Sequence, residues 1–129
     1  MKIVISSQGQ VLEAMVDPRF GRCAYFIIYD TETKEIEALS NQASEAAGGA
    51  GIVASQLVVD KGVEAVITGN VGPNAFQTLN QAKIKIFGGA SGTVKESLEK
   101  YEKGELNELS SSSVPRHFGM EKDKGGSRK

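Results

Sequence analysis

The sequence predicts an α/β domain built on a mixed β-sheet with helices over its faces. Two observations support this prediction. Short β-branched runs recur along the chain, and after the third run they alternate with segments of helical apolar spacing. With 129 residues, the chain is long enough to bury one hydrophobic core, so a second domain is not needed.

The first half of the chain is predicted to be an antiparallel meander. Strands are expected at residues 2–6, 24–30 and 34–40, with a polar hairpin link at 31–33. Ile3-Val4-Ile5 is apolar on consecutive residues, as in a central strand covered on both faces, whereas 34–40 mixes charged and apolar residues like an edge strand. Residues 11–19 are expected to form a loop that packs through Val11, Leu12, Met15 and Val16.

The second half is predicted to add two βα units and a last helix. Strands are expected at 64–68 and 84–87, and helices at about 51–61, 73–81 and 93–103. Gly62 stands where a left-handed cap belongs, Pro73 suits a first helical turn, and Thr93 with Glu96 has the spacing of a capping box. Right-handed crossovers place these strands parallel to the first, so their carboxyl ends share one edge of the sheet, where ligands gather.

Charge and composition exclude several classes of protein. Fifteen Lys and Arg against 16 Asp and Glu leave a net charge of −1, without the dense basic face that nucleic-acid binding needs. The single cysteine forms no internal disulfide, and the N-terminus enters a strand without signal-peptide features. Apolar runs are far shorter than the roughly 20 residues of a membrane span. We therefore expect a soluble, cytoplasmic protein with no nucleic-acid or membrane partner.

The end of the chain differs in composition from the rest. Residues 110–113 are four serines, and a charged, glycine-containing stretch follows them. Low hydrophobicity and high charge density predict a flexible tail at 110–129 after a domain at 1–109. His117, the only histidine, lies in this tail, where it is either solvated or folds back as a metal ligand.

Two glycine-rich turns precede the first two predicted helices at the shared sheet edge. Glycine lets backbone N–H groups approach a ligand, and a helix N-terminus favours an anion. The turns could equally be flexible connections, and neither is a phosphate-binding loop of the Gly-x-x-x-x-Gly-Lys-Ser/Thr type. The binding residues predicted here are Gly48, Gly49, Gly51, Gly69, Asn70, Gly72 and Asn74.

The second strand runs antiparallel to the first, so its start brings Arg22 and Cys23 to the same edge. Arg19 and Arg22 could offer charge-assisted donors to an anion, or tie the loop to a carboxylate such as Asp17. Cys23 is either a soft metal ligand or a small buried hydrophobe. No Cys-x-x-Cys occurs, and no histidine before residue 110 could activate a serine, so we expect no enzyme.

Four motifs in order resemble the dinitrogenase iron-molybdenum cofactor biosynthesis family, in its small stand-alone members, over about residues 1–109. They are Phe20-Gly21-Arg22-Cys23-Ala24-Tyr25-Phe26, Gly48-Gly49-Ala50-Gly51, Gly69-Asn70-Val71-Gly72-Pro73-Asn74-Ala75 and Gly88-Gly89-Ala90-Ser91-Gly92-Thr93-Val94. The resemblance implies a ribonuclease H-like fold with sheet order 3-2-1-4-5 and about three helices, without ribonuclease activity.

The resemblance also implies a function. It is the non-enzymatic binding, carrying or assembly of an anionic metal–sulfur cluster, of iron–sulfur, iron–molybdenum or molybdenum–copper type, by a monomer or weak homodimer. A cluster donor or acceptor protein is the implied partner. Several family members have His immediately before the Phe-Gly pair, where this chain has Arg19. This difference argues against histidine ligation at that position and favours ligation by Cys23 or non-covalent binding of the cluster. A small-molecule or nucleotide-binding domain and a regulatory interaction module are the alternative interpretations.

Overall fold

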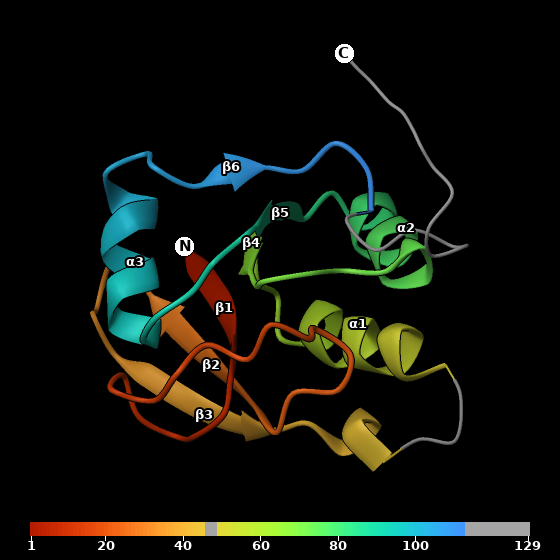
Figure 1. Cartoon of the computed structure of the whole chain (residues 1–129), viewed down its shortest axis with the longest axis horizontal. Helices are drawn as coiled ribbons and strands as arrows, with labels where there is room; N and C mark the ends of the chain where they lie inside the picture. Colours follow the sequence, from red (N-terminus) through yellow and green to blue (C-terminus); the bar gives the residue numbers. More distant parts are fainter. Residues whose placement is uncertain (46–48, 113–129) are drawn as a thin grey trace.

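A mixed β-sheet forms the middle of the protein (Figure 1). The computed structural model describes residues 1–45 and 49–112. In these residues the sheet has six strands in the order β3-β2-β1-β4-β5-β6. They are β1 (Lys2–Ser7), β2 (Tyr25–Asp30), β3 (Ile36–Ser40), β4 (Ala65–Ile67), β5 (Lys85–Gly88) and β6 (Asn107–Glu108).

The predicted strand order 3-2-1-4-5 is confirmed, but the predicted number of five strands is wrong. β1 pairs antiparallel with β2 and parallel with β4, and β5 continues the parallel part. The extra strand, β6, pairs antiparallel with β5 through Asn107 and Glu108. Two polar residues carry neither the alternation nor the β-branched side chains that indicate a strand, so only tertiary pairing reveals it.

The helices lie on both faces of the sheet (Figure 1). α1 (Ala50–Asp60) and α2 (Pro73–Gln81) cover one face, and α3 (Val94–Glu102) covers the other. Their predicted end signals are confirmed. Gly62 has a φ of 71°, Pro73 opens α2, and Thr93 with Glu96 forms a capping box. A 3-10 turn, η1 (Gln42–Glu45), was not predicted, because its small polar residues resemble a loop.

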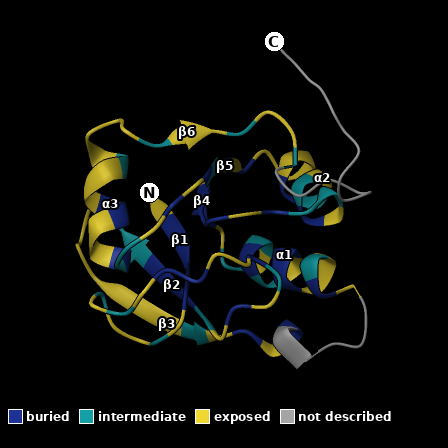
Figure 2. Cartoon of the chain, in the orientation of Figure 1, coloured by how far each residue is buried: buried dark blue, intermediate teal, exposed yellow. Residues whose placement is uncertain are grey.

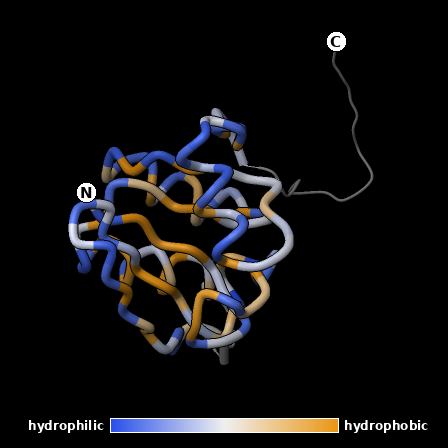
Figure 3. Tube along the Cα trace, turned by 90° about the vertical axis from the view of Figure 1, so that its left-hand side faces the viewer, coloured by the Kyte–Doolittle hydropathy of each residue, from blue (hydrophilic) through white to orange (hydrophobic). Residues whose placement is uncertain are grey.

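Two hydrophobic clusters hold the layers together. Val4, Phe26 and Val66 pack with α1 and α2, whereas Ile5 and Ile67 pack with α3. β1 is buried on both faces, as predicted for a central strand, and Figure 2 shows β1 and β4 as the buried centre of the sheet. Figure 3 shows the hydrophobic strands running between more hydrophilic outer segments. Burying each large aliphatic side chain contributes about 1.5–3 kcal/mol, so the centre of the sheet dominates stability.

The segment from residue 11 to 19 is the predicted loop, but it packs through fewer residues than expected. Val16 is buried, and Leu12 packs against the α3 cluster. Val11 and Met15 are 53% and 49% exposed, so the prediction that they pack inward is wrong. The loop is fixed through its backbone instead, since Val16 bridges Ser7 and Met15 bridges Thr93.

None of the helices within residues 1–45 and 49–112 combines the length and apolar character required to cross a bilayer. The predictions for Gly48, His117 and most of the 110–129 tail fall outside the described residues.

Candidate functional site: a cleft between two helix starts

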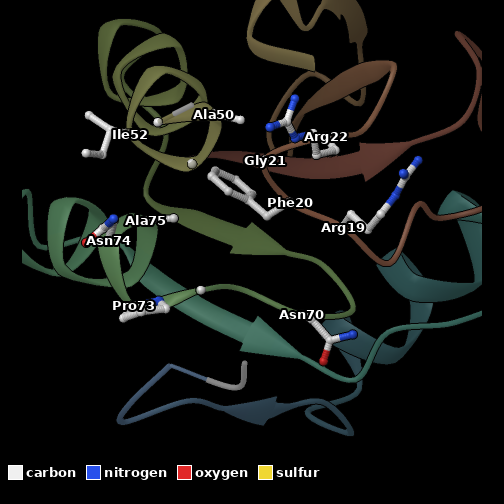
Figure 4. A pocket seen from close by; sticks show the side chains of 13 residues that line it. Arg19, Phe20, Gly21, Arg22, Ala50, Ile52, Asn70, Pro73, Asn74 and Ala75 are labelled. Atoms are coloured by element: carbon white, nitrogen blue, oxygen red, sulfur yellow. The ribbon is translucent and has the colours of Figure 1, made fainter. Parts of the chain in front are cut away.

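A cleft of about 440 Å³ lies at the carboxyl edge of the parallel strands (Figure 4). Three segments line it: the loop before β2, the start of α1 and the turn that leads into α2. Seven of the predicted binding residues come together there, namely Arg19, Arg22, Gly49, Gly51, Asn70, Gly72 and Asn74. Motifs separated by up to 55 positions along the chain therefore share one surface.

Six further lining residues were not predicted as binding residues. They are Phe20, Gly21, Ala50, Ile52, Pro73 and Ala75. Each adjoins a predicted residue along the chain, and Phe20 and Gly21 belong to the motif that opens with them. Their adjacency was the available signal, but an apolar side chain carries no chemical signature of a binding site.

Glycines allow the three walls of the cleft to approach one another closely. A Cβ atom on Gly21 would lie 3.1 Å from the backbone nitrogen of Gly51. A Cβ atom on Gly51 would lie 3.2 Å from the Cβ of Ala75. The loop before β2 therefore rests on the start of α1, which in turn rests on α2.

Gly69 also allows a close approach of two backbone segments, at the other end of the cleft. Gly69 is not among the described residues that line the cleft. A Cβ atom there would lie 2.6 Å from the Cα of Pro18. The close approach allows the Asn70 N–H to donate to the Pro18 carbonyl at 2.7 Å, and the Phe20 N–H to donate to the Asn70 carbonyl at 3.3 Å. These bonds fix Arg19 opposite Asn70.

The starts of α1 and α2 both face the cleft without side-chain caps. Gly49, in the left-handed region at φ 71°, precedes α1, and Gly72, in an extended conformation, precedes α2. Within the described part of the chain, neither N-cap residue makes a side-chain cap bond, and neither first turn carries an acidic residue. The first N–H groups of a helix have no acceptor inside it, and the helix dipole is positive at this end. Both helix ends thus present partial positive charge to the cleft.

The two arginines of the cleft differ in their surroundings. Arg22 is exposed, and its side chain lies beside the start of α1 (Figure 4). Arg19 is bound by Asp17, whose carboxylate accepts hydrogen bonds from Nε at 3.2 Å and Nη2 at 3.3 Å. This hydrogen bond and the charge of Asp17, which is only 3% exposed, raise the pKa of Arg19. Arg19 therefore ties the loop to Asp17, and the carboxylate balances its charge.

Cys23 lies beneath the cleft and is not among the described residues that line it. It is fully buried, and its Sγ lies 3.4 Å from the Phe20 carbonyl. Burial, together with the charge of the nearby Asp17, raises the pKa of the Cys23 thiol to about 12. At neutral pH the sulfur is therefore protonated and lies in the core. This agrees with the interpretation of Cys23 as a small buried hydrophobe rather than as a soft metal ligand.

The described residues also offer no other site for a metal bound by side chains. Among residues 1–45 and 49–112, no group of three or more His, Cys, Asp or Glu is placed to hold a metal ion. The donors of the cleft are instead backbone N–H groups, amide side chains and arginine. Such donors suit the outer atoms of an anion rather than a bare cation.

Comparison with known proteins agrees with this architecture. The family model described as Dinitrogenase iron-molybdenum cofactor matches residues 1–104. The chain belongs to this family. The match contains all three walls of the cleft, so the site described above lies within the part that family members share.

Two solved structures and one sequence resemble this family member. The apo form of the orange protein from Desulfovibrio gigas has a TM-score of 0.85 and 33% identity, and the match covers 88% of this chain and 96% of that one. The NMR structure of a Thermotoga protein of the DUF35 family has a TM-score of 0.77 and 42% identity, covering 88% and 97%. An uncharacterized protein of Methanocaldococcus jannaschii is 30% identical over 97 residues, which is 73% of this chain and 82% of that protein.

Proposed function

We propose that the cleft binds and carries an anionic metal–sulfur cluster, and that the protein catalyses no reaction. One observation carries the proposal: the starts of two helices open into the same cleft without side-chain caps. Each offers the positive end of a dipole and first-turn N–H groups that have no acceptor inside the helix, although Pro73 at the start of α2 contributes none. Membership of the dinitrogenase iron-molybdenum cofactor family supports a metal–sulfur cargo over other anions.

The surroundings of Cys23 favour non-covalent binding of this cargo. A cysteine that binds the metal of a cluster must present its sulfur at the surface of the site, whereas Cys23 is fully buried and does not line the cleft among the described residues. The cluster would therefore bring all of its own sulfur ligands. Its outer sulfides would accept hydrogen bonds from the glycine backbone around Gly49 and Gly72 and from Arg22, while its metals would touch no protein atom.

The size and lining of the cleft suit such a cargo. A volume of about 440 Å³ falls in the range of roughly 300–1,000 Å³ that holds small ligands. Ile52 is 43% exposed and provides apolar surface for polarizable sulfur, while Phe20 and Ala75 line the cleft but are almost fully buried. Asn70 and Asn74 place amide groups at the rim (Figure 4). In this role the protein would receive the cluster from one assembly protein and pass it to another.

Anaerobic titration with tetrathiomolybdate, followed by visible absorption and calorimetry, tests the proposal directly. Reconstitution with iron, sulfide and molybdate, followed by metal analysis of the desalted protein, extends the test to larger clusters. We expect one binding site per chain. Substituting Arg22→Ala should weaken tetrathiomolybdate binding about tenfold, because one charge-assisted donor is lost.

Lys95→Ala provides the matched control, because it removes one positive charge from α3 on the other face of the sheet. It should leave the affinity unchanged. A wild-type protein that retains neither thiomolybdate nor a reconstituted cluster would contradict the proposal. Thermal stabilisation by nucleotides, with none by tetrathiomolybdate, would favour a small-molecule-binding domain instead.

A further inference from the structure

Asn41 is a buried side chain whose hydrogen bonds flank Arg22. It follows the last residue of β3 and is 2% exposed. Its Nδ2 donates to the Gly21 carbonyl at 3.1 Å and to the Cys23 carbonyl at 2.8 Å. These two carbonyls belong to the residues immediately before and after Arg22. A single amide group thus holds the backbone on both sides of the cleft arginine.

The remaining polar atoms of Asn41 anchor this arrangement to the sheet. Its backbone N–H donates to the Ala24 carbonyl at 3.0 Å, which extends the pairing of β2 and β3 by one step. Its Oδ1 accepts the Ala43 N–H at 3.1 Å and so fixes the start of η1. Loops are in general more mobile than strands, and Asn41 therefore ties the loop before β2 to the rigid end of β3.

Fixing this loop also fixes one wall of the cleft. Gly21 lies against the first turn of α1, since a Cβ atom on it would come within 3.2 Å of the Gly51 Cα. The Asn41 bond to the Gly21 carbonyl holds that contact in place. The distance between Arg22 and the N–H groups at the start of α1 is thereby set from beneath, outside the cleft.

We propose that Asn41 is a positioning residue for Arg22. It holds the arginine beside the start of α1, so that the guanidinium group and the helix N-terminus act on the same anion. The statement about anion binding rests on the proposed function, whereas the statement about the loop does not. Asparagine suits the position because one side chain supplies two N–H donors and an acceptor. Neither aspartate, which lacks the donors, nor alanine can replace these bonds.

Binding measurements on four proteins test the first statement: the wild type, Asn41→Ala, Arg22→Ala and the double variant. Asn41→Ala should weaken tetrathiomolybdate binding about tenfold, as Arg22→Ala does. In the double variant the losses should not add, and its affinity should lie within about twofold of that of Arg22→Ala. Leu98→Ala, a core truncation in α3 on the other face, controls for lost stability and should bind like the wild type.

Cys23 provides a second readout that needs no ligand. Its Sγ lies beneath the same loop, 3.6 Å from the Asn41 Nδ2. If Asn41 holds the loop closed, native-state alkylation of Cys23 by iodoacetamide should be at least about tenfold faster in Asn41→Ala than in Leu98→Ala, because local opening exposes the thiol.

The outcomes separate the inference from the proposed function. Wild-type affinity in Asn41→Ala, or fully additive losses in the double variant, would overturn the positioning role while the proposed function stands. If the wild type retains neither tetrathiomolybdate nor a reconstituted cluster, the proposed function fails, and alkylation alone decides the inference. Equal alkylation rates in Asn41→Ala and Leu98→Ala would then refute it, and the faster rate would uphold the role of Asn41 in fixing the loop.

Discussion

The helix starts of this protein are treated in two different ways. At the start of α3, the Thr93 side chain accepts the Glu96 N–H at 3.1 Å, and the Glu96 carboxylate accepts the Thr93 N–H at 2.8 Å. At the starts of α1 and α2, glycine stands in the cap position and makes no such bond within the described residues. The protein thus satisfies one helix end internally and leaves two open to a shared cleft.

Under the proposed function, this difference corresponds to stability exchanged for binding. A Ser, Thr or Asp cap is typically worth a few tenths of a kcal/mol more than glycine, and the extended backbone at Gly72 could accept one, whereas the left-handed backbone at Gly49 favours glycine. Glycine at Gly72 forgoes that gain, and at both positions no side chain competes for the first N–H groups of the helix. The contrast therefore supports the proposal that the starts of α1 and α2 are the ends that bind the anion.

Gly69→Ala should have the largest effect, because it breaks the contact that brings the open ends to the loop. The new Cβ would lie 2.6 Å from the Pro18 Cα, which is a backbone atom and cannot move aside as a flexible side chain could. We expect a loss of about 1–3 kcal/mol in the free energy of unfolding. Tetrathiomolybdate binding should fall more than tenfold, because Asn70 and Arg19 move apart.

Gly72→Ala is the matched control for Gly69→Ala. A Cβ atom on Gly72 meets no described atom within 4 Å, and its φ of −79° suits any residue. Urea unfolding should therefore show a change of less than about 0.5 kcal/mol. Equal losses in the two variants would show that the close approach of residues 18 and 69 is unimportant.

Gly72→Asp should convert the open start of α2 into a closed one like that of α3. The extended backbone at Gly72 is the conformation of a capping residue, so the carboxylate can bond to the first N–H groups. Stability should rise by about half a kcal/mol, while tetrathiomolybdate binding should weaken at least about tenfold through competition and charge repulsion.

Urea unfolding and calorimetry measure the two effects of Gly72→Asp, which have opposite signs. Gly72→Asn separates cap competition from charge, and its loss of affinity should be the smaller of the two. Unchanged affinity in Gly72→Asp would mean that the start of α2 does not contribute to anion binding.

Changes at α3 test the other side of the comparison. Thr93→Ala should cost about 1 kcal/mol of stability through loss of the cap, with no effect on tetrathiomolybdate binding. Hydrogen bonding from the Thr93 N–H lowers the pKa of Glu96 below its usual 4.5. The ionised cap therefore stabilises the fold above about pH 4.5, and this contribution is lost as the pH falls through the lowered pKa.

Glu96→Gln isolates this pH dependence, because it retains an acceptor but does not titrate. Its stability deficit relative to the wild type should be present at pH 7 and should shrink as the pH falls below about 4.5 in urea titrations. A deficit that is constant from pH 7 to pH 3 would show that the ionised form of Glu96 is not what stabilises the cap.

The sequence was sufficient for the parts of the fold that local chemistry determines. Consecutive apolar residues in β1 indicated a central strand, and Gly62, Pro73 and Thr93 marked helix ends correctly. β6 was missed because its two residues form a strand only by pairing with β5. The ribonuclease H-like assignment stays a prediction.

For the site too, the features set by local sequence were predictable and those set by tertiary contacts were not. Glycine clusters and the direction of the strands were enough to bring Arg22, Gly51 and Asn74 to one edge. The position of Cys23 was not predictable, because the sequence shows that a thiol lies near the edge but not which way it points. Asn41 gave no signal either, since its role depends on carbonyls some 20 residues earlier in the chain.

Cys23→Ala should have the smallest effect on binding, and it distinguishes the helix ends from the thiol as the source of affinity. Because Cys23 lies beneath the cleft with a pKa of about 12, removing it should leave tetrathiomolybdate affinity within about twofold of the wild type. The affinity of the wild type should also show no thiol inflection between pH 7 and pH 9, since the sulfur stays protonated throughout. Calorimetric titration of both proteins across this range tests the two expectations together.

A loss of binding in Cys23→Ala, or an increase in wild-type affinity as the pH rises, would mean that the thiolate does reach the cargo. The uncapped starts of α1 and α2 would then serve only to orient a covalently held cluster.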